Sequence, residues 1–144
     1  NDLKNHRNND IEFVLEQMLQ YEGQTGPYLQ YTSVRINSLL NQKEYCLNKD
    51  IDSSLFNKSH YFEIIRTLSK FQKLIEKGVL ENDPSIIAKY ALILASNFNK
   101  FYALERIIVS DNKICNTNLI ISYCVKTVLD GCMRLLGMKI LREM

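Results

Sequence analysis

Few residues that break helices occur in this chain of 144 residues. It contains five glycines and two prolines, so long helices can run with few interruptions. Hydrophobic residues make up 46% of the sequence and charged residues 24%, which is ordinary for a globular protein with its own core. No apolar run approaches the roughly 18–20 residues of a membrane span. The composition therefore predicts a globular, helical protein and no membrane partner.

Groups that could perform catalysis are also scarce. The chain has two histidines, and it carries neither a phosphate-binding loop of the Walker type nor a G-x-S-x-G elbow. Acidic side chains such as Glu63, Glu76 and Glu105 fall on polar helix faces, where charges are usually solvated. We therefore expect no catalytic residues in this chain, and a function in binding.

The four cysteines do not have the spacing of a metal site. They stand at Cys46, Cys115, Cys124 and Cys132, and no two are separated by the short gap typical of zinc ligands. Cys124 and Cys132 lie on the apolar side of one predicted helix and are interpreted as core residues. We expect no metal, reduced thiols and a cytoplasmic location.

The recurring pattern in the chain has the period of a helix, and no strand shows the alternation of a sheet. Apolar stripes predict an all-α bundle of about five helices, which begin near residues 11, 25, 59, 84 and 117. Thr25, Ser59 and Asp83 are predicted helix caps, and Pro27 and Pro84 fit first turns. Gly78 and Gly137 are predicted to end helices, so the second, third and fifth helices are expected to cover residues 25–45, 59–78 and 117–137.

One face of the second helix carries two aromatic rings and a cation. Tyr28, Tyr31 and Arg35 stand at positions i, i+3 and i+7, so they share that face. Aromatic rings stack on unpaired bases, and a guanidinium binds phosphate or stacks as a plane. With a net charge of only +2, RNA contact would depend on such placed residues and not on bulk charge. The same residues also fit half-buried tyrosines and a solvated arginine.

Three blocks of this sequence resemble arginyl-tRNA synthetases in order and spacing. Residues 26–35, GPYLQYTSVR, are similar to the family pattern GPYLQYAxxR. Residues 83–106 contain LASNFNKFY, which resembles the pattern LAxxFNxFY. Residues 128–144, VLDGCMRLLGMKILREM, are similar to the ending VLxxGxxLLGIxxPxxM. The last two blocks are typical of the wider helical anticodon-binding fold named for its DALR residues.

The resemblance implies roles for five positions in this sequence. Tyr28, Tyr31 and Arg35 would line the anticodon-loop surface, Tyr102 would join them from the fourth helix, and Met144 would contact the anticodon region. Taken from the residues alone, Tyr102 lies on an apolar stripe and would be a core residue, and Met144 would be a frayed end.

The departures from the family pattern are local. Cys132 stands where the family usually has glycine, Leu141 replaces a proline in the tail, and Asn118 occupies a position that is often arginine. The HIGH and KMSK-type nucleotide-binding signatures of class I synthetases are absent, so this chain alone should not activate arginine.

The resemblance implies the anticodon-binding domain of an arginine–tRNA ligase. Residues 25–144 would form this domain, and residues 1–24 would be the end of the catalytic domain and the junction; the chain begins with Asn and is expected to be part of a longer protein. The parent enzyme would attach arginine to its tRNA with ATP and magnesium, as a monomer in the cytoplasm. Two alternatives stay open: a helical protein-interaction module without RNA binding, and the same domain from a related class Ia synthetase.

Overall fold

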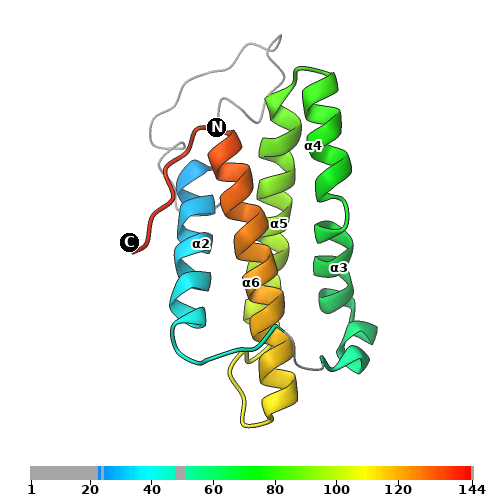
Figure 1. Cartoon of the computed structure of the whole chain (residues 1–144), viewed down its shortest axis with the longest axis vertical. Coiled ribbons are helices and arrows are strands. Elements are labelled where there is room, and N and C mark those ends of the chain that lie inside the picture. Colours follow the sequence, from blue (N-terminus) through cyan, green and yellow to red (C-terminus); the bar gives the residue numbers. More distant parts are fainter. Residues whose placement is uncertain (1–22, 24, 48–50, 144) are drawn as a thin grey trace.

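The protein is an all-helical bundle built around two long helices. In the computed structural model, which describes residues 23, 25–47 and 51–143, these are α5 (Pro84–Leu104) and α6 (Asn112–Leu135). The two run side by side in opposite directions along the longest axis (Figure 1). Within the described residues, no helix combines the length and the hydrophobicity needed to cross a membrane.

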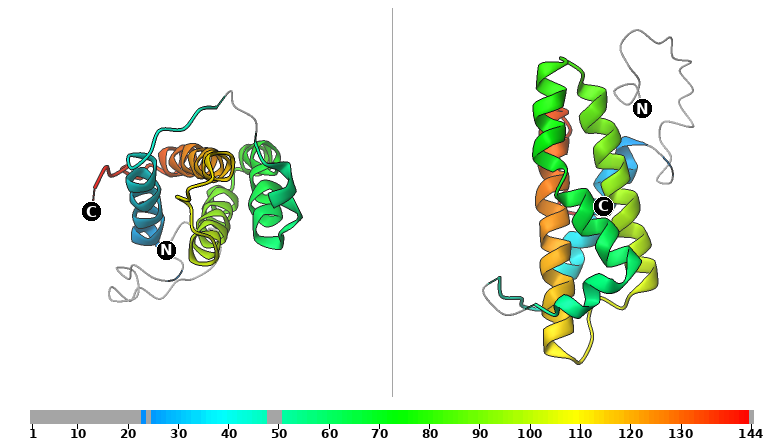
Figure 2. Two further views of the ribbon diagram at one scale, coloured as in Figure 1. Left: turned by 90° about the horizontal axis from the view of Figure 1, so that it is seen from below. Right: turned by 90° about the vertical axis from the view of Figure 1, so that its right-hand side faces the viewer.

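The remaining helices cover the two sides of this central pair. On one side, α2 (Gly26–Leu40) packs against both α5 and α6. On the other side, α3 (Ser59–Leu68) and α4 (Phe71–Leu80) follow each other along α5, and the short 3-10 helix η2 (Ser53–Asn57) leads into α3. Seen from below, the long pair stands between α2 and the α3–α4 arm (Figure 2, left). The predicted all-α class is confirmed.

The core lies along the seams between these helices. Its largest fully buried apolar side chains come from every described α-helix except α4, and they are Ile36, Tyr61, Ile64, Leu94, Phe98, Phe101, Leu119, Val125, Leu129 and Met133. The predicted apolar stripe of α5 is confirmed from Ile87 to Phe101. Cys132 is buried as predicted, and desolvation raises the pKa of its thiol to about 12. Cys124 is only half-buried.

The predicted caps are confirmed at two of the three positions. The Thr25 hydroxyl accepts a hydrogen bond from the Tyr28 amide at the start of α2, and the Asp83 carboxylate accepts one from the Ser85 amide at the start of α5. Ser59 is not a cap, since Lys58 holds that position and α3 begins without a side-chain cap. The third helix therefore begins at the predicted position, at Ser59, but without the predicted capping hydrogen bond.

Two predicted helices are shorter than their apolar patterns indicated. The second ends at Leu40 and not near residue 45, because Asn41 and Gln42 turn the chain away. The predicted helix over residues 59–78 is interrupted at Ser69 and Lys70. There the Ser69 hydroxyl donates to the Arg66 carbonyl, a local bond of the kind that competes with helix continuation.

The turn between α4 and α5 also differs from the prediction. Gly78 does not end α4, which continues to Leu80. A Cβ at Gly78 would lie 3.4 Å from Ile87 Cγ1, at the short end of ordinary van der Waals contact, so α4 and α5 lie close together at this position. The left-handed conformation that turns the chain falls on Asn82, with φ of 49°, and asparagine tolerates that region better than most residues.

The last helix begins earlier than predicted. Asp111 caps α6 by accepting hydrogen bonds from the amides of Lys113 and Ile114, so the helix starts at Asn112 and not at Thr117 or Asn118. Thr117 and Asn118 are instead buried polar residues of its second turn. The Asn118 amide group accepts from the Tyr61 hydroxyl and donates to the Ile107 carbonyl.

After α6 the chain turns back along α2. Gly137 ends the helix as predicted, with φ of 71° in the left-handed region. Two side chains of α2 then fix the tail: Gln30 donates to the Lys139 carbonyl and Asn37 to the Arg142 carbonyl. The tail therefore follows the outer side of α2 (Figure 1). The predicted helix over residues 11–21 lies outside the described residues.

Candidate nucleic-acid interface

The predicted pairing of an aromatic ring with a cation on α2 is present in the structure. Leu29, Ile36 and Leu39 bury one side of this helix, which leaves Tyr31 and Arg35 on its partly exposed side. The Arg35 guanidinium lies 4.6 Å from the Tyr31 ring centroid, and its Nη2 donates to the Tyr31 hydroxyl over 2.6 Å. One turn of helix thus brings the two side chains into direct contact.

The second ring comes from the end of α5. The Tyr102 ring centroid lies 4.9 Å from Arg35 Cζ, so one guanidinium contacts rings from two helices. Tyr31 is 38% exposed and Tyr102 39%, and the predicted core position of Tyr102 is therefore wrong. Its place on the apolar stripe is misleading because α5 ends two residues later. Tyr31, Arg35 and Tyr102 form what we call the cation–aromatic cluster.

Asn99 of α5 connects this cluster to Tyr28. Its Oδ1 accepts from Arg35 Nη1 over 2.7 Å, and its Nδ2 donates to the Tyr28 hydroxyl over 2.9 Å and to Thr32 Oγ1 over 2.8 Å. Sequence reasoning did not select Asn99. A signal was available, because Asn99 is the fixed asparagine of the LAxxFNxFY pattern. It also stands one turn before Tyr102, which places both residues on adjoining parts of one helix face.

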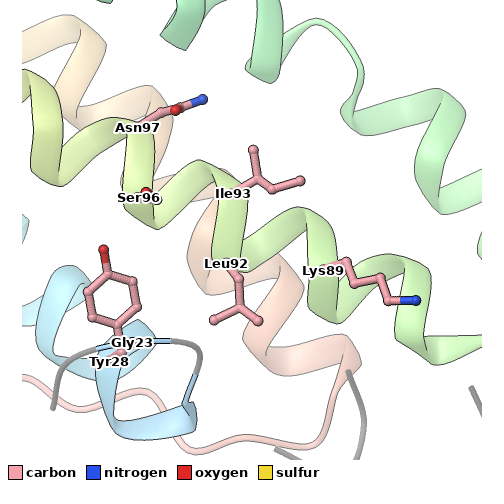
Figure 3. Close-up of a pocket in the computed structure, with 7 residues that line it drawn as sticks. All are labelled: Gly23, Tyr28, Lys89, Leu92, Ile93, Ser96 and Asn97. Atoms are coloured by element: carbon pink, nitrogen blue, oxygen red, sulfur yellow. The ribbon is translucent and has the colours of Figure 1, made fainter. Parts of the chain in front are cut away.

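Tyr28 differs from the rings of Tyr31 and Tyr102 because it lines a separate cavity. That cavity has a volume of about 720 Å³, and α5 forms most of its wall through Lys89, Leu92 and Ile93. The Tyr28 ring stands in it across from α5 (Figure 3). The structure therefore links Tyr28 to the cluster through its hydroxyl, while the body of its ring lies outside the cluster.

A small hollow lies directly beside the cation–aromatic cluster. It has a volume of about 290 Å³, and its lining combines the three cluster side chains with apolar and polar neighbours. Val34 and Leu39 supply the apolar surface, and Ser38 and Gln42 supply groups that can donate and accept hydrogen bonds. Aromatic faces, a cation and amide and hydroxyl groups around one hollow are the chemistry that binds a splayed base.

Met144, the fifth predicted site residue, lies outside the described residues. The described part of the tail runs along α2 as far as Glu143 and is held there by Gln30 and Asn37. The described part of the tail thus lies beside the helix that carries Tyr31 and Arg35. The role of Met144 stays a prediction.

One acidic side chain predicted to be solvated is not. The Glu105 side chain is 19% exposed, and its Oε1 lies 2.7 Å from Lys58 Nζ and 2.8 Å from His60 Nε2. Burial alone would raise the pKa of Glu105, but the hydrogen bonds and charges of Lys58 and His60 outweigh it and lower that pKa. This ionic contact joins the start of α3 to the end of α5.

The other two predicted surface carboxylates are on the surface. Glu63 pairs with Arg66 across one turn of α3, with both side chains well exposed, and Glu76 accepts a hydrogen bond from Gln72 on α4. In the part of the chain that the structure describes, no three His, Cys, Asp or Glu side chains gather as they would around a metal ion.

The chain is similar over most of its length to proteins of known function. The family model of the DALR anticodon binding domain matches residues 29–144. Arginine–tRNA ligase 1 of Bacillus thuringiensis subsp. konkukian is 41% identical over 143 residues, which are 99% of this chain and 25% of that protein. The arginine–tRNA ligase of Streptococcus uberis is 41% identical over 138 residues, covering 96% of this chain and 24% of the relative.

Solved structures agree with these relatives. The arginyl-tRNA synthetase of Thermus thermophilus matches with a TM-score of 0.88 at 23% identity, over 98% of this chain and 25% of that one, and at this identity it shows the fold alone. The arginyl-tRNA synthetase of Plasmodium falciparum matches with a TM-score of 0.83 at 28% identity, over 99% of this chain and 25% of that one.

The chain spans about a quarter of the length of the relatives that it matches. The family match covers far more than half of the chain, and the resemblance seen in its three sequence blocks is confirmed. The chain therefore belongs to the DALR anticodon-binding domain family and corresponds to the C-terminal quarter of arginine–tRNA ligases.

Proposed function

We propose that this domain binds the anticodon stem-loop of arginine tRNA through the cation–aromatic cluster. The observation that carries the proposal is the convergence of Tyr31, Arg35 and Tyr102 from two helices, with both rings more than a third exposed. Base stacking on an exposed ring contributes about 1–3 kcal/mol per base. The hollow beside the cluster would hold one base, with Ser38 and Gln42 at its edges.

The charge of Arg35 supports contact with a phosphate or with a base edge. Asn99 and Tyr31 engage two of the five N–H donors of its guanidinium. Among the described residues, no hydrogen bond involves the other three donors. A polyanion can therefore bind this cation without first breaking the contacts that hold it in place.

The remaining predicted residues extend the same surface. Tyr28 would support it through Asn99, and Met144 would reach it from the tail that follows α2. Residues 25–144 would act as the anticodon-binding domain, and residues 1–24 as the junction to a catalytic domain. The whole enzyme would be a monomer in the cytoplasm that joins arginine to its tRNA with ATP and magnesium, and these cofactors would bind outside this domain.

The test is a titration of the 144-residue chain with a labelled RNA hairpin that carries an arginine anticodon. A hairpin with a scrambled loop is the control, and fluorescence anisotropy reports binding. We expect tighter binding to the arginine hairpin, and a loss of about 1–3 kcal/mol for Arg35→Ala with unchanged helical circular dichroism. Equal binding of the two hairpins, or an Arg35→Ala variant with full affinity, would contradict the proposal and favour a protein-interaction module.

A further inference from the structure

We propose that Asn99 is a positioning residue for RNA binding, which holds the Arg35 guanidinium against the two rings. This inference rests on the proposed function and adds a residue that makes no contact with RNA itself. Asn99 is partly buried on α5, and its amide makes three hydrogen bonds, with Arg35, Tyr28 and Thr32.

The orientation of the Asn99 amide is determined by its partners. A guanidinium has only donors, so the amide oxygen must face Arg35. The Thr32 hydroxyl donates its proton to the Tyr28 carbonyl over 2.9 Å, so toward Asn99 it can only accept. The amide nitrogen must therefore face Thr32, and the same nitrogen also donates to the Tyr28 hydroxyl.

No other side chain of this size satisfies both requirements. An aspartate at position 99 would accept from Arg35 but would place a second acceptor against Thr32 Oγ1, whose proton is already used. Its negative charge would also pair with the guanidinium and cancel the attraction to a phosphate. An asparagine positions the arginine and leaves its positive charge intact.

The position of Asn99 explains how two helices act as one binding surface. It lies on α5, as Tyr102 does, and it contacts Arg35 of α2 directly. Arg35 Cζ lies within 5 Å of both ring centroids, at 4.6 Å and 4.9 Å. Without the hydrogen bond that Asn99 accepts, the guanidinium would keep, among the described residues, only its hydrogen bond to the Tyr31 hydroxyl. The long arginine side chain would then sample several rotamers.

The experiment compares Asn99→Asp with Asn97→Asp in the 144-residue chain. Asn97 is a matched control because it lies two residues away on α5, is also partly buried and bonds to Thr67 on the opposite side. Both variants add the same negative charge. We expect at least a tenfold loss of affinity for the arginine anticodon hairpin with Asn99→Asp, and less than a threefold loss with Asn97→Asp.

Two further measurements separate positioning from a general effect on the fold. The slope of log K against log salt should become shallower by about 0.7 in Asn99→Asp, as expected when one phosphate contact to a single strand is lost. In the Arg35→Ala background, the additional loss caused by Asn99→Asp should fall to that caused by Asn97→Asp, because only the added charge remains when the residue that Asn99 positions is absent.

The outcomes distinguish this inference from the function on which it rests. Equal losses for the two aspartate variants, or the same fold-loss for Asn99→Asp with and without Arg35, would overturn the role of Asn99 alone. Full affinity of Arg35→Ala would overturn the proposed function and the inference with it. Thermal unfolding of Asn99→Asp checks the fold, and if it is lost, Asn99→Ser takes its place with the same expected dependence on Arg35.

Discussion

Arg35 is the residue on which the candidate interface depends most. Its guanidinium makes four contacts at once: with two ring faces, with the Tyr31 hydroxyl and with the Asn99 carboxamide. These contacts need a planar group with donors at fixed angles. A lysine at this position would supply the same charge as a compact ammonium on a flexible stem, without the plane and without the fork of donors.

Replacing Arg35 with lysine tests whether shape matters beyond charge. We expect Arg35→Lys to retain part of the RNA affinity and to fall between wild type and Arg35→Ala, at about 1 kcal/mol below wild type. Anisotropy titration with the arginine anticodon hairpin measures this. Arg134→Lys is a suitable control, since Arg134 is exposed near the end of α6 and belongs to none of the described site contacts. Full affinity of Arg35→Lys would show that charge alone is sufficient.

Some of this site follows from sequence, and some depends on coordinates. The spacing of Tyr31 and Arg35 predicts their contact, because residues four apart on a helix are neighbours. The meeting of Arg35 with Tyr102 is a tertiary contact between residues far apart in sequence, and helix periodicity alone assigned Tyr102 to the core. Asn99 is a fixed position of the LAxxFNxFY pattern, but its role could not be predicted, since that role depends on which group each side of its amide faces.

At the level of helices, local chemistry predicted starts better than ends. Thr25 and Asp83 were recognised because a cap and a proline precede an apolar stripe. Asp111 was missed because no proline follows it and because Asn112, Lys113 and Asn116 interrupt the apolar pattern at the start of α6. The interruption at Ser69 was missed for the opposite reason: apolar residues at three- and four-residue spacing continue across it into α4, as Leu68 and Phe71 illustrate.

The cap of α6 is expected to contribute measurably to stability. Asp111 accepts hydrogen bonds from two amides that have no partner within the helix. Asp111→Ala should therefore lower the free energy of unfolding by about 1 kcal/mol, as measured by urea denaturation. The neighbouring exposed Ser110, changed to alanine, should shift it by much less. An equal free energy of unfolding for wild type and Asp111→Ala would contradict this prediction, because water would then satisfy the two amides as well as the carboxylate does.

On the scale of the whole molecule, the bundle is a scaffold that fixes α2 against α5. The two helices meet along a buried seam, and both also pack on α6. Half-buried ionic contacts add to this packing: Lys126 pairs with Asp130 beside Ser33 of α2, and Glu105 joins α5 to α3. Two rings and a cation can then keep a fixed geometry before RNA arrives.

The ionic contact of Glu105 with Lys58 and His60 makes the free energy of unfolding depend on pH. Its pKa is lowered in the folded protein, so the stabilisation is fully present above the unfolded value of about 4.5 and is lost as the pH falls through the lower, folded value. Glu105→Gln should reduce the free energy of unfolding by about 1 kcal/mol at pH 7. The difference from wild type should shrink below about pH 4.

Urea denaturation between pH 3 and pH 7 measures this dependence. Glu76→Gln is the matched control, because Glu76 is exposed on α4 and accepts a hydrogen bond from Gln72 there. It should show a small change at every pH. A gap between Glu105→Gln and wild type that stays constant down to pH 3 would contradict the assigned role of the carboxylate charge.

The most direct test of the central claim is to map where RNA binds on the folded domain. Backbone amide signals of the ¹⁵N-labelled chain are followed by NMR while the arginine anticodon hairpin is added. We predict that the largest shifts fall on α2 around Tyr31 and Arg35 and on the last turns of α5 around Asn99 and Tyr102. Shifts centred on α3 and α4, with the cation–aromatic cluster unchanged, would contradict the account.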